Sequence, residues 1–468
     1  MTNLWILTEE KPKRSVVVEI LKKYSMEYNK MTEFDAKGIL ISPVFKENRY
    51  SFTCEVYGVN IEGILNIYLK TVSGGSSFLD YLLIEQDDEP NDGDCSNMVM
   101  AFEETKTSDD ESRNTGVYQR ASKFAFISAY STTAKTYMLY NDELNARENK
   151  KPSDTSIFGT NMLLTLGVEI LGKSNLNWFK KYESIDELIN AKNSMRRPPA
   201  GNVPILISKY DDRIEVSGRL SKPAEVGNIG HDPNIGALSL IAKCLRKLGW
   251  DKKIVITQHG VSQKYINRTR GRNKFLYICK LYGVILDGII MPENYDLPKK
   301  YWHYEKSSEK VTSILLHVLA ENNGIKEVYQ NHAGCERGYF YTKDKKAITL
   351  PKKDSGGVEN LYIPDLILYD SLTDTILLIE AKKLSTLNKG LIEIQHYDSI
   401  ENEYIRKYYP NAKNLRYLTL FGGNIREIPH ENVLIHMNSD GSVLINKDAP
   451  NFIKELFEDN NKEAISEE

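Results

Sequence analysis

Hydrophobic residues recur along this chain with two periods, one typical of helices and one typical of strands. Near the N-terminus, apolar residues three or four positions apart predict an amphipathic helix over residues 13–28: Val17, Ile20, Leu21 and Tyr24. Between residues 38 and 83, apolar runs separated by polar turns predict strands. The apolar run 97–102 predicts another strand, and residues 116–130 have a helical pattern.

The middle of the chain mixes both patterns. Ser184 and Glu187 form a capping box, because the serine hydroxyl and the glutamate can satisfy each other's free backbone N–H groups, so a helix is expected to follow. A second helix is expected to begin at Pro233 and to end at Gly249, and the apolar strand 254–257 follows directly. A helix that leads straight into a strand predicts an α/β sheet in this region.

The C-terminal part has the order helix, hairpin, helix, strand. The first of these helices is expected to begin at Ser308 and to end at Gly324. The strand 375–380 is apolar on both faces, which predicts a central position in a sheet. The other elements are expected at residues 365–369, 391–408 and 415–421.

Composition restricts the function only loosely. The 468 residues are 41% hydrophobic and 27% charged, which is ordinary for a globular chain of two or three domains. The net charge of -3 means that any basic surface must be local. No apolar run approaches the ~18 residues of a membrane span, and no signal-peptide pattern is present. The five cysteines lack C-x-x-C spacing, so we expect a cytoplasmic protein without structural zinc.

The most informative chemistry lies where an apolar strand ends in a carboxylate, one spacer and a lysine. Glu380 and Lys382 share one face of their strand, because residues two apart project to the same side. Asp365 opens the preceding strand fifteen positions earlier, so a hairpin can bring the three side chains together. Carboxylate oxygens suit Mg²⁺, and the lysine can hold or activate a water. A metal site is predicted here, and the alternative is a solvated ion-pair cluster at a sheet end.

A second set of residues repeats this pattern nearer the N-terminus: Asp80, Glu104 and Lys106. Its two acids are twenty-four positions apart, so they meet only if the acidic segment 85–94 is a long hairpin loop. In the alternative interpretation, Glu103 is the outward-facing partner of Lys123 or of another base.

The spacing alone is not specific, because it also occurs twice elsewhere. Residues 9–11 and 148–150 match it, but both sit in polar sequence where no strand is expected to precede them. The preceding strand is therefore the feature that separates the candidate sites from chance matches.

The motifs Pro364-Asp365 and Glu380-Ala381-Lys382 resemble those of the PD-(D/E)XK nuclease superfamily. The resemblance implies that the acids bind Mg²⁺ and that the lysine assists the attacking water. It extends to the set that begins at Asp80, although no proline precedes that residue. Further positions match the glutamine that often follows on a helix and the extra acid on a preceding helix: Gln395 and Gln119, and Glu309 and Glu19.

In size and layout the chain resembles bacterial type II restriction endonucleases that hold two nuclease sites in one chain. The resemblance implies an α/β protein with two PD-(D/E)XK-like mixed-sheet domains flanked by helices, residues 1–145 and 299–468. A mixed α/β middle region, residues 146–298, would read the DNA. It also implies Mg²⁺-dependent cleavage of double-stranded DNA with one strand cut per site, a cognate DNA methyltransferase, and a monomer if both sites are active.

Residues 264–274 carry five positive charges and no acid, which predicts a DNA contact. Lysine and arginine can neutralise phosphates, arginine can also bind guanine, and asparagine can bind adenine. The alternative is a basic surface loop that contacts phosphates without sequence choice. The candidates are Lys264, Asn267, Arg268, Arg270, Arg272, Asn273 and Lys274, with a smaller second group at Lys192, Arg196 and Arg197.

Three other functions stay open at the level of the sequence, one of which is a repair or RNA nuclease. A chain with a single working nuclease site would need to act as a dimer in order to cut both strands. A non-catalytic DNA-binding protein on a nuclease-like fold would bind DNA in a salt-sensitive way without cleaving it.

Overall fold

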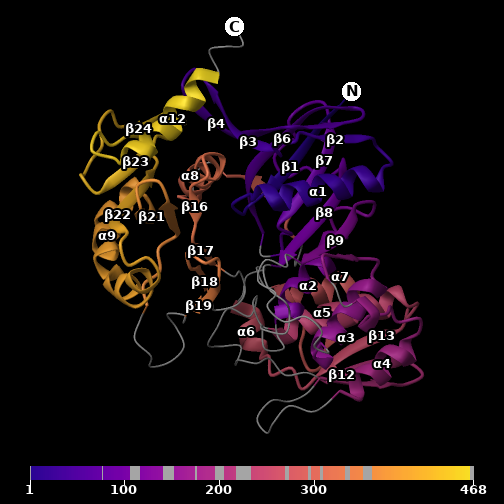
Figure 1. Ribbon diagram of the computed structural model, residues 1–468. Helices are drawn as coiled ribbons and strands as arrows, with labels where there is room; N and C mark the ends of the chain where they lie inside the picture. The colour runs from indigo at the N-terminus through magenta and orange to yellow at the C-terminus, as the bar shows by residue number, and fades with distance from the viewer. Residues whose placement is uncertain are drawn as a thin grey trace. The chain divides into compact units, whose positions relative to one another are not determined.

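The structure is a computed structural model that combines helices with several mixed sheets, so the fold is α/β, as predicted (Figure 1). It describes residues 2–75, 77–105, 116–140, 152–173, 176–195, 205–217, 233–268, 274–292, 297–305, 309–331, 338–350 and 361–463. The chain divides into two compact units. The terminal unit comprises Met1–Ser73, Leu83–Asn91 and His303–Glu468, and the central unit comprises Gly74–Leu82 and Asp92–Trp302.

These units do not follow the three predicted domains. The terminal unit takes most of residues 299–468 together with much of residues 1–145, and the central unit takes all of residues 146–298 and the rest of the N-terminal segment. The three-domain organisation therefore stays a prediction.

The N-terminal part of the terminal unit consists of one helix and several strands. The helix α1 (Arg14–Glu27) buries Val17, Ile20, Leu21 and Tyr24, which confirms the predicted amphipathic helix. Strand β6 (Ile64–Gly74) pairs in an antiparallel manner with β4 (Arg49–Tyr57), which pairs in turn with β3 (Leu40–Lys46). A separate antiparallel pair joins β2 (Thr32–Phe34) to β5 (Val59–Ile61).

The first strand, β1 (Thr2–Thr8), was not predicted. It pairs in parallel with β6, and its residues 4–7 are buried. A run of four apolar residues has no clear period, so its pattern does not distinguish a strand from a buried helix turn. Because β1 ends immediately before Glu9, the expectation that no strand precedes residues 9–11 is wrong. Residues 148–150 lie outside the described residues.

The C-terminal part of the terminal unit is built on a mixed sheet with strand order β16-β20-β21-β22-β23-β24. Strand β20 is antiparallel to β21, whereas β21, β22 and β23 run parallel to one another. The helix α8 (Lys310–Asn322) packs on β20, β21 and β22. The strands are β16 (Lys326–Glu327), β20 (Leu366–Asp370), β21 (Thr375–Lys383), β22 (Lys413–Phe421), β23 (Val433–Met437) and β24 (Val443–Ile445).

Two smaller parts complete this unit. Strands β17 (Tyr329–Asn331), β18 (Gly338–Tyr341) and β19 (Ala347–Leu350) form an antiparallel sheet of their own. The last helix, α12 (Asn451–Glu463), packs on α8.

The predicted C-terminal elements are present, with two differences. Ser308, expected to begin the first helix, lies outside the described residues, while Gly324 follows the end of α8 with a φ of 73°. The helix expected over residues 391–408 starts earlier and is broken by 3₁₀ and π turns, which often mark strained or functional segments. Its pieces are α9 (Leu387–Glu393), η5 (Ile394–Tyr397), α10 (Asp398–Ile400), η6 (Glu401–Ile405) and α11 (Arg406–Tyr408).

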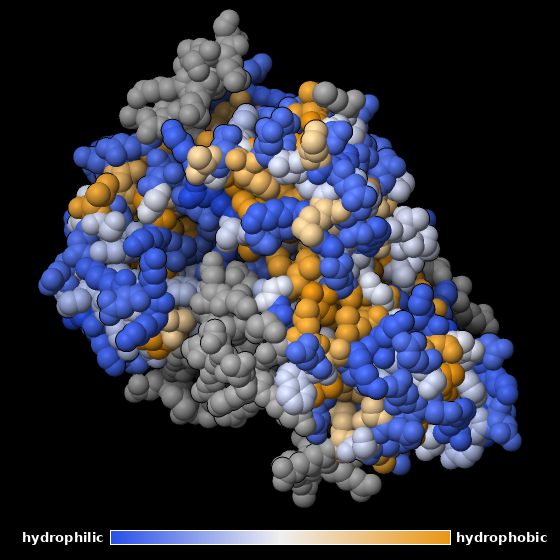
Figure 2. Space-filling model, turned by 45° about the vertical axis from the view of Figure 1, so that its right-hand side comes forward, coloured by the Kyte–Doolittle hydropathy of each residue, from blue (hydrophilic) through white to orange (hydrophobic). Residues whose placement is uncertain are grey.

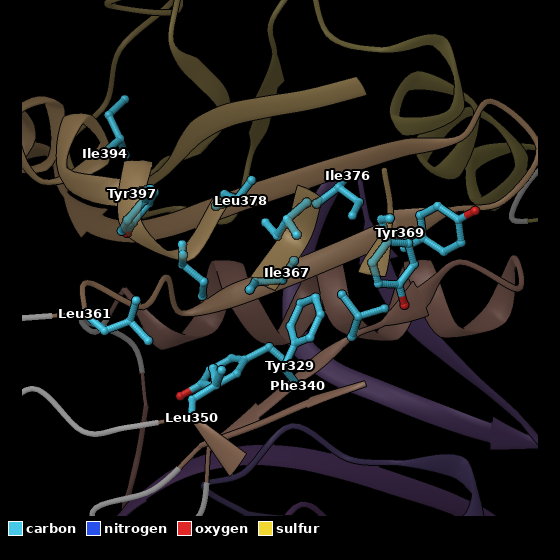
Figure 3. Close-up of a cluster of buried hydrophobic side chains, with 14 of the residues drawn as sticks. Tyr329, Phe340, Leu350, Leu361, Ile367, Tyr369, Ile376, Leu378, Ile394 and Tyr397 are labelled. Carbon is cyan, nitrogen blue, oxygen red and sulfur yellow. The ribbon is translucent and has the colours of Figure 1, made fainter. Parts of the chain in front are cut away.

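One face of the C-terminal sheet is covered by this broken helix and by β18 and β19 (Figure 3). Alternate residues of the central strands are buried there: Ile367 and Tyr369 of β20, Ile376 and Leu378 of β21, and Leu418 and Leu420 of β22. Each such burial contributes about 1.5–3 kcal/mol to folding. Because side chains alternate along a strand, Asp365, Glu380 and Lys382 continue this same face beyond the apolar core.

The central unit contains a group of strands and a second sheet. Strand β8 (Met98–Thr105) lies next to β7 (Tyr81–Gln86), whose first two residues belong to this unit, and pairs in parallel with β9 (Lys135–Tyr140). Strand β10 (Glu169–Leu171) is parallel to β9. In the second sheet β12, β13 and β14 are parallel and β11 is antiparallel, with bounds β11 (Leu206–Lys209), β12 (Arg213–Ser217), β13 (Lys253–Thr257) and β14 (Val284–Leu286).

Helices α2, α3 and α5 of the central unit pack on one another. The helix α5 leads through Gly249, with a φ of 91°, into the parallel strand β13, which confirms the predicted helix-to-strand unit. The helices of this unit are α2 (Gly116–Ile127), α3 (Asp154–Thr165), α4 (Ile185–Asn193), α5 (Pro233–Lys247), α6 (Gln263–Arg268) and α7 (Lys274–Tyr282).

Half of the predicted capping box at the start of α4 is present. The Ser184 hydroxyl accepts a hydrogen bond from the Glu187 N–H at 3.2 Å. The Glu187 carboxylate instead accepts from the N–H of Glu183 at 2.9 Å. The N–H of Glu187 is therefore satisfied by the serine, and the sequence signal correctly marked the helix start.

The visible face in Figure 2 is mainly hydrophilic, and hydrophobic residues gather in places between the polar ones. Among the residues that the structure describes, the most exposed large hydrophobic side chains are Leu372, Ile290, Met31 and Met26. No helix within the described ranges has the length and apolar character needed to cross a membrane. The described cysteines are buried and form no disulfide, and Cys335 lies outside the described residues.

Candidate functional site

The β20–β21 hairpin brings Asp365 and Glu380 together, as the sequence spacing predicted. Leu366 pairs with Ile379, so the register places Asp365 opposite Glu380. The Oδ2 atom of Asp365 accepts a hydrogen bond from the backbone N–H of Ala381 at 2.9 Å. The Asp365 side chain is thus fixed to the end of β21, on the face where Glu380 and Lys382 project.

Lys382 joins the carboxylates at this end of the sheet. Its ammonium contacts Oε1 of Glu380 and lies 2.6 Å from Oε2 of Glu393, in α9. The hydroxyl of Tyr397 donates a hydrogen bond to the other oxygen of Glu380. Sequence reasoning missed Glu393 and Tyr397, although both lie in the helix that was expected to follow β21.

The electrostatics of this cluster favour an added cation. Burial and the charge of Asp365 raise the pKa of Glu380 to about 7, against the lowering effect of Lys382 and Tyr397. Although Asp365 is exposed as a residue, removal of water from around its carboxyl raises its pKa, and the charge of Glu309 adds to this effect. The Ala381 N–H, Lys382 and Lys11 act in the opposite direction on the pKa of Asp365. Carboxylates crowded in this way are stabilised by a positive ion.

Three more residues lie around this site. Glu309 is half-buried and directly precedes α8, and its influence on the pKa of Asp365 shows that it lies near that carboxyl. Lys11, missed by sequence reasoning, pairs with Glu327 and lies 3.4 Å from the backbone oxygen of Asp365. Gln395 is exposed, and its backbone oxygen accepts a hydrogen bond from Arg416 at 3.3 Å. A role for the Gln395 side chain stays a prediction.

The residues of this site fit Mg²⁺, which needs few protein ligands, better than they fit a metal whose ligands all come from the protein. Among the residues that the structure describes, no group of three or more histidine, cysteine, aspartate or glutamate side chains is arranged to hold a metal ion. The hairpin instead offers two carboxylates, Asp365 and Glu380. Mg²⁺ typically binds through one or two carboxylates and completes its shell with waters and substrate phosphates.

The second candidate centre lies in the central unit. Asp80 receives two hydrogen bonds, from the backbone N–H of Glu104 to Oδ2 at 2.8 Å and from Lys123 to Oδ1 at 3.0 Å. The same ammonium lies 2.7 Å from Oε2 of Glu103. Residues 87–97 connect the neighbouring strands β7 and β8, so the acidic segment is the long connection that this pairing required.

The alternative interpretation of Glu103 was right about its partner and wrong about its position. Glu103 pairs with Lys123, but its side chain is only 2% exposed and does not face outward. Burial and the charge of Asp80 raise the pKa of Glu103, while Lys123 and Arg120 oppose this rise. Burial tends to lower the pKa of Lys123, but the attraction of Asp80 and Glu103 outweighs it and raises that pKa.

Other residues expected near this second centre are only partly described. Lys106 lies outside the described residues, and Gln119 lies in α2 with its side chain outside them. Glu19 belongs to the terminal unit, is exposed on α1 and pairs with Lys22 at 2.9 Å. It is therefore a solvated glutamate on a helix surface.

The predicted DNA-binding segment is helical at both of its described ends, whereas the alternative interpretation described it as a surface loop. Lys264 and Asn267 are exposed on α6, and Arg268 ends that helix while Lys274 begins α7. The side chains of Arg268 and Lys274, and all of Arg270, Arg272 and Asn273, lie outside the described residues.

The smaller basic group is described only at its first member. Lys192 is half-buried on α4 with its ammonium 5.7 Å from the centre of the Phe158 ring. Arg196 and Arg197 lie outside the described residues, so their contact with DNA stays a prediction.

Comparisons with known proteins give no independent indication of function: no protein-family model matches the sequence, and no curated protein matches it. A functional conclusion therefore depends on the residues and on their geometry.

Proposed function

We propose that the chain is a Mg²⁺-dependent, sequence-specific endonuclease for double-stranded DNA. The observation that carries this proposal is the position of Asp365 opposite Glu380, on the strand face from which Lys382 also projects. Two acids and an ammonium at the open end of a hairpin provide the groups that metal-assisted hydrolysis of a phosphodiester requires.

The order of elements around this hairpin supports the resemblance to PD-(D/E)XK nucleases. The hairpin β20–β21 is followed by the broken helix and then by β22, which is parallel to β21. This is the helix, hairpin, helix, strand order in which the motif residues were expected. We extend the proposal to a type II restriction enzyme with one strand cut per active site, a monomeric active form and a cognate DNA methyltransferase.

Each residue of the cluster has a distinct role in this proposal. Asp365 and Glu380 would hold Mg²⁺, which supplies positive charge next to the phosphate as negative charge builds up during water attack. The Lys382 ammonium orients the water through its hydrogen bonds. Glu393 and Tyr397 are positioning residues, because one contacts the Lys382 ammonium and the other fixes an oxygen of Glu380.

DNA binding must be local on a chain whose net charge is -3. The basic segment 264–274 supplies five positive charges, and the described Lys264 and Asn267 are exposed. We propose that this segment contacts the phosphates and bases of the target.

Replacement of Lys382 tests the proposal. Wild-type protein, Lys382→Ala and the matched control Lys383→Ala are incubated with supercoiled, unmodified plasmids and Mg²⁺. Lys383 is exposed and is the neighbouring residue on the same strand, so its loss should leave cleavage unchanged. Loss of Lys382 should slow cutting of one strand by about 10²-fold or more, so nicked circles accumulate.

Two outcomes would contradict the proposal. Full linearisation by Lys382→Ala at the wild-type rate would show that this site is not needed. Salt-sensitive DNA binding without metal-dependent cleavage by any variant, including the wild type, would favour a non-catalytic DNA-binding protein.

A further inference from the structure

We infer that the second nuclease centre is formed by Asp80, Glu103 and Lys123, rather than by Asp80, Glu104 and Lys106. This inference rests on the proposed function and specifies which residues of the central unit perform the chemistry. It reassigns the second acid by one position and takes the ammonium from Lys123 of helix α2 instead of from Lys106.

The reassignment follows from one backbone contact that occurs in both centres. In the terminal unit, Asp365 Oδ2 accepts the N–H of Ala381, the residue directly after the acid Glu380. In the central unit, Asp80 Oδ2 accepts the N–H of Glu104. By this contact Glu104 corresponds to Ala381, so the acid that corresponds to Glu380 is Glu103.

The elements around the two contacts also correspond. The strand orders are β20-β21-β22 in one centre and β7-β8-β9 in the other. In each order, the first strand follows the aspartate and the middle strand carries the second acid. The third strand comes later in the chain and is parallel to the middle one. Glu380 pairs with Leu418 on that later strand, and Glu103 pairs with Met138. A helix lies between the second and third strands in the sequence, α2 in one case and α9 in the other.

With this alignment, Thr105 takes the position of Lys382. A threonine has no ammonium group, so a cation must come from another element if the centre is to work in the same way. Lys123 of α2 meets this need, because its Nζ lies 3.0 Å from Asp80 Oδ1 and 2.7 Å from Glu103 Oε2. Successive side chains of a strand point to opposite faces, so the Glu104 carboxylate points away from the face that carries Glu103.

Both carboxyls of the cluster are removed from bulk water. Lys123 contacts both of them, and Arg120 adds a second positive charge that acts on Glu103. The side chain of Lys123 is 20% exposed and that of Asp80 is 10% exposed, so the cluster lies at the edge of the protein interior and not in its centre. If this ion triad served only folding, removing one partner would destabilise the protein without affecting any metal.

The first test uses wild-type protein, so it does not depend on any variant folding. Fe²⁺ replaces Mg²⁺, and ascorbate with peroxide then generates radicals that cut the backbone next to the bound metal. We expect cuts near Asp80 and Glu103 as well as near Asp365 and Glu380, and excess Mg²⁺ should suppress both sets. Cuts confined to Asp365 and Glu380 would overturn this inference alone, whereas cuts at neither place would also oppose the proposed function.

The second test identifies the residues by strand-specific nicking of a plasmid. Glu103→Gln and Lys123→Met should each slow cutting of one strand by about 10²-fold or more, and this strand should be the one that Lys382→Ala still cuts. The matched control is Lys181→Met, a lysine of the same unit whose side chain is 64% exposed. The inference is overturned if Glu104→Gln and Lys106→Ala block that strand while Glu103→Gln and Lys123→Met cut it at the wild-type rate.

Discussion

At the scale of single residues, Glu327 shows how this protein keeps a buried acid charged. Its carboxylate pairs with Lys11 and lies 2.6 Å from Nδ1 of His317. Burial alone would raise the pKa of Glu327, but the two basic partners outweigh it and hold the pKa well below the ordinary value. Because the folded-state pKa is depressed, the stabilisation is present above the unfolded pKa and is lost as pH falls below it.

We predict that Glu327→Gln destabilises the protein strongly at pH 7 and less strongly in acid. Removing one partner of a buried ion pair costs about 3 kcal/mol, and this difference should shrink as pH falls from about 4.5 toward 3. Thermal unfolding midpoints of the wild type and the variant at pH 7 and at pH 3.5 measure the effect. Equal shifts in the midpoint at both pH values would contradict the role of this charge.

Lys243 is the opposite case, because no acid in the described part of the chain forms an ion pair with its ammonium. Burial in α5 lowers its pKa to about 8, and its ammonium donates a hydrogen bond to the Phe124 backbone oxygen at 2.6 Å. We predict that Lys243→Met stabilises the protein by about 1–3 kcal/mol at pH 7. The gain should shrink as pH rises above 8, because the wild-type lysine then loses its proton in the folded state. Thermal unfolding at pH 7 and pH 10 tests this, and a gain independent of pH would contradict it.

At the scale of secondary-structure elements, the helix α9 holds the Lys382 side chain against the end of β21. Gly390 makes this approach possible, because a Cβ there would lie 2.8 Å from Cγ of Lys382 and 3.0 Å from Cδ2 of Leu418. The glycine therefore serves close packing at the candidate site, although glycine within a helix usually lowers stability.

We predict that Gly390→Ala impairs cleavage of one strand while the protein stays folded. The added methyl group must displace the Lys382 stem, and a misplacement of about 1 Å can cost roughly 10²-fold in rate. Asn388→Ala, an exposed position in the same helix, is the matched control. Nicking rates together with circular dichroism make the measurement, and a Gly390→Ala protein as active as Asn388→Ala would contradict this role.

The sequence predicts those helices and strands in which apolar residues recur at regular spacing. Where this spacing is lost, the sequence does not show which residues face the core or each other. The α1 helix and the β20–β21 hairpin follow from apolar spacing, and the single acid at the end of β21 made Glu380 unambiguous. Strand β8 ends in two adjacent acids, and both of its faces are buried, so alternation does not show whether Glu103 or Glu104 faces Asp80. A shift of one residue exchanges the two faces, and only the observed register resolves it.

At the scale of the whole molecule, the compact units combine segments that are far apart in the sequence. The terminal unit gathers Met1–Ser73 with His303–Glu468, and local patterns carry no information about such long-range grouping. The α/β class could be predicted because it follows from the alternation of elements. The division into units could not, since it depends on contacts between distant segments.

Each unit contains a cluster of two acids and an ammonium, around Asp365 in the terminal unit and around Asp80 in the central unit. The proposal of two nuclease centres depends on this repetition. Two centres in one chain can cut the two strands of DNA without a second copy of the protein. We therefore expect the rate of double-strand cleavage per protein molecule to be independent of protein concentration, as measured on a single-site DNA. A total cleavage rate that rises with the square of the protein concentration would instead indicate a dimer with one working centre per chain.

The most direct measurement is sequencing of the DNA ends that the wild type and Glu380→Gln produce on a long unmodified DNA with Mg²⁺. We predict that the wild type cuts both strands at one recurring sequence, and that Glu380→Gln cuts only one strand at the same sequence. Ends without a recurring sequence, or both strands still cut by Glu380→Gln, would contradict the claim that Asp365, Glu380 and Lys382 form a nuclease centre.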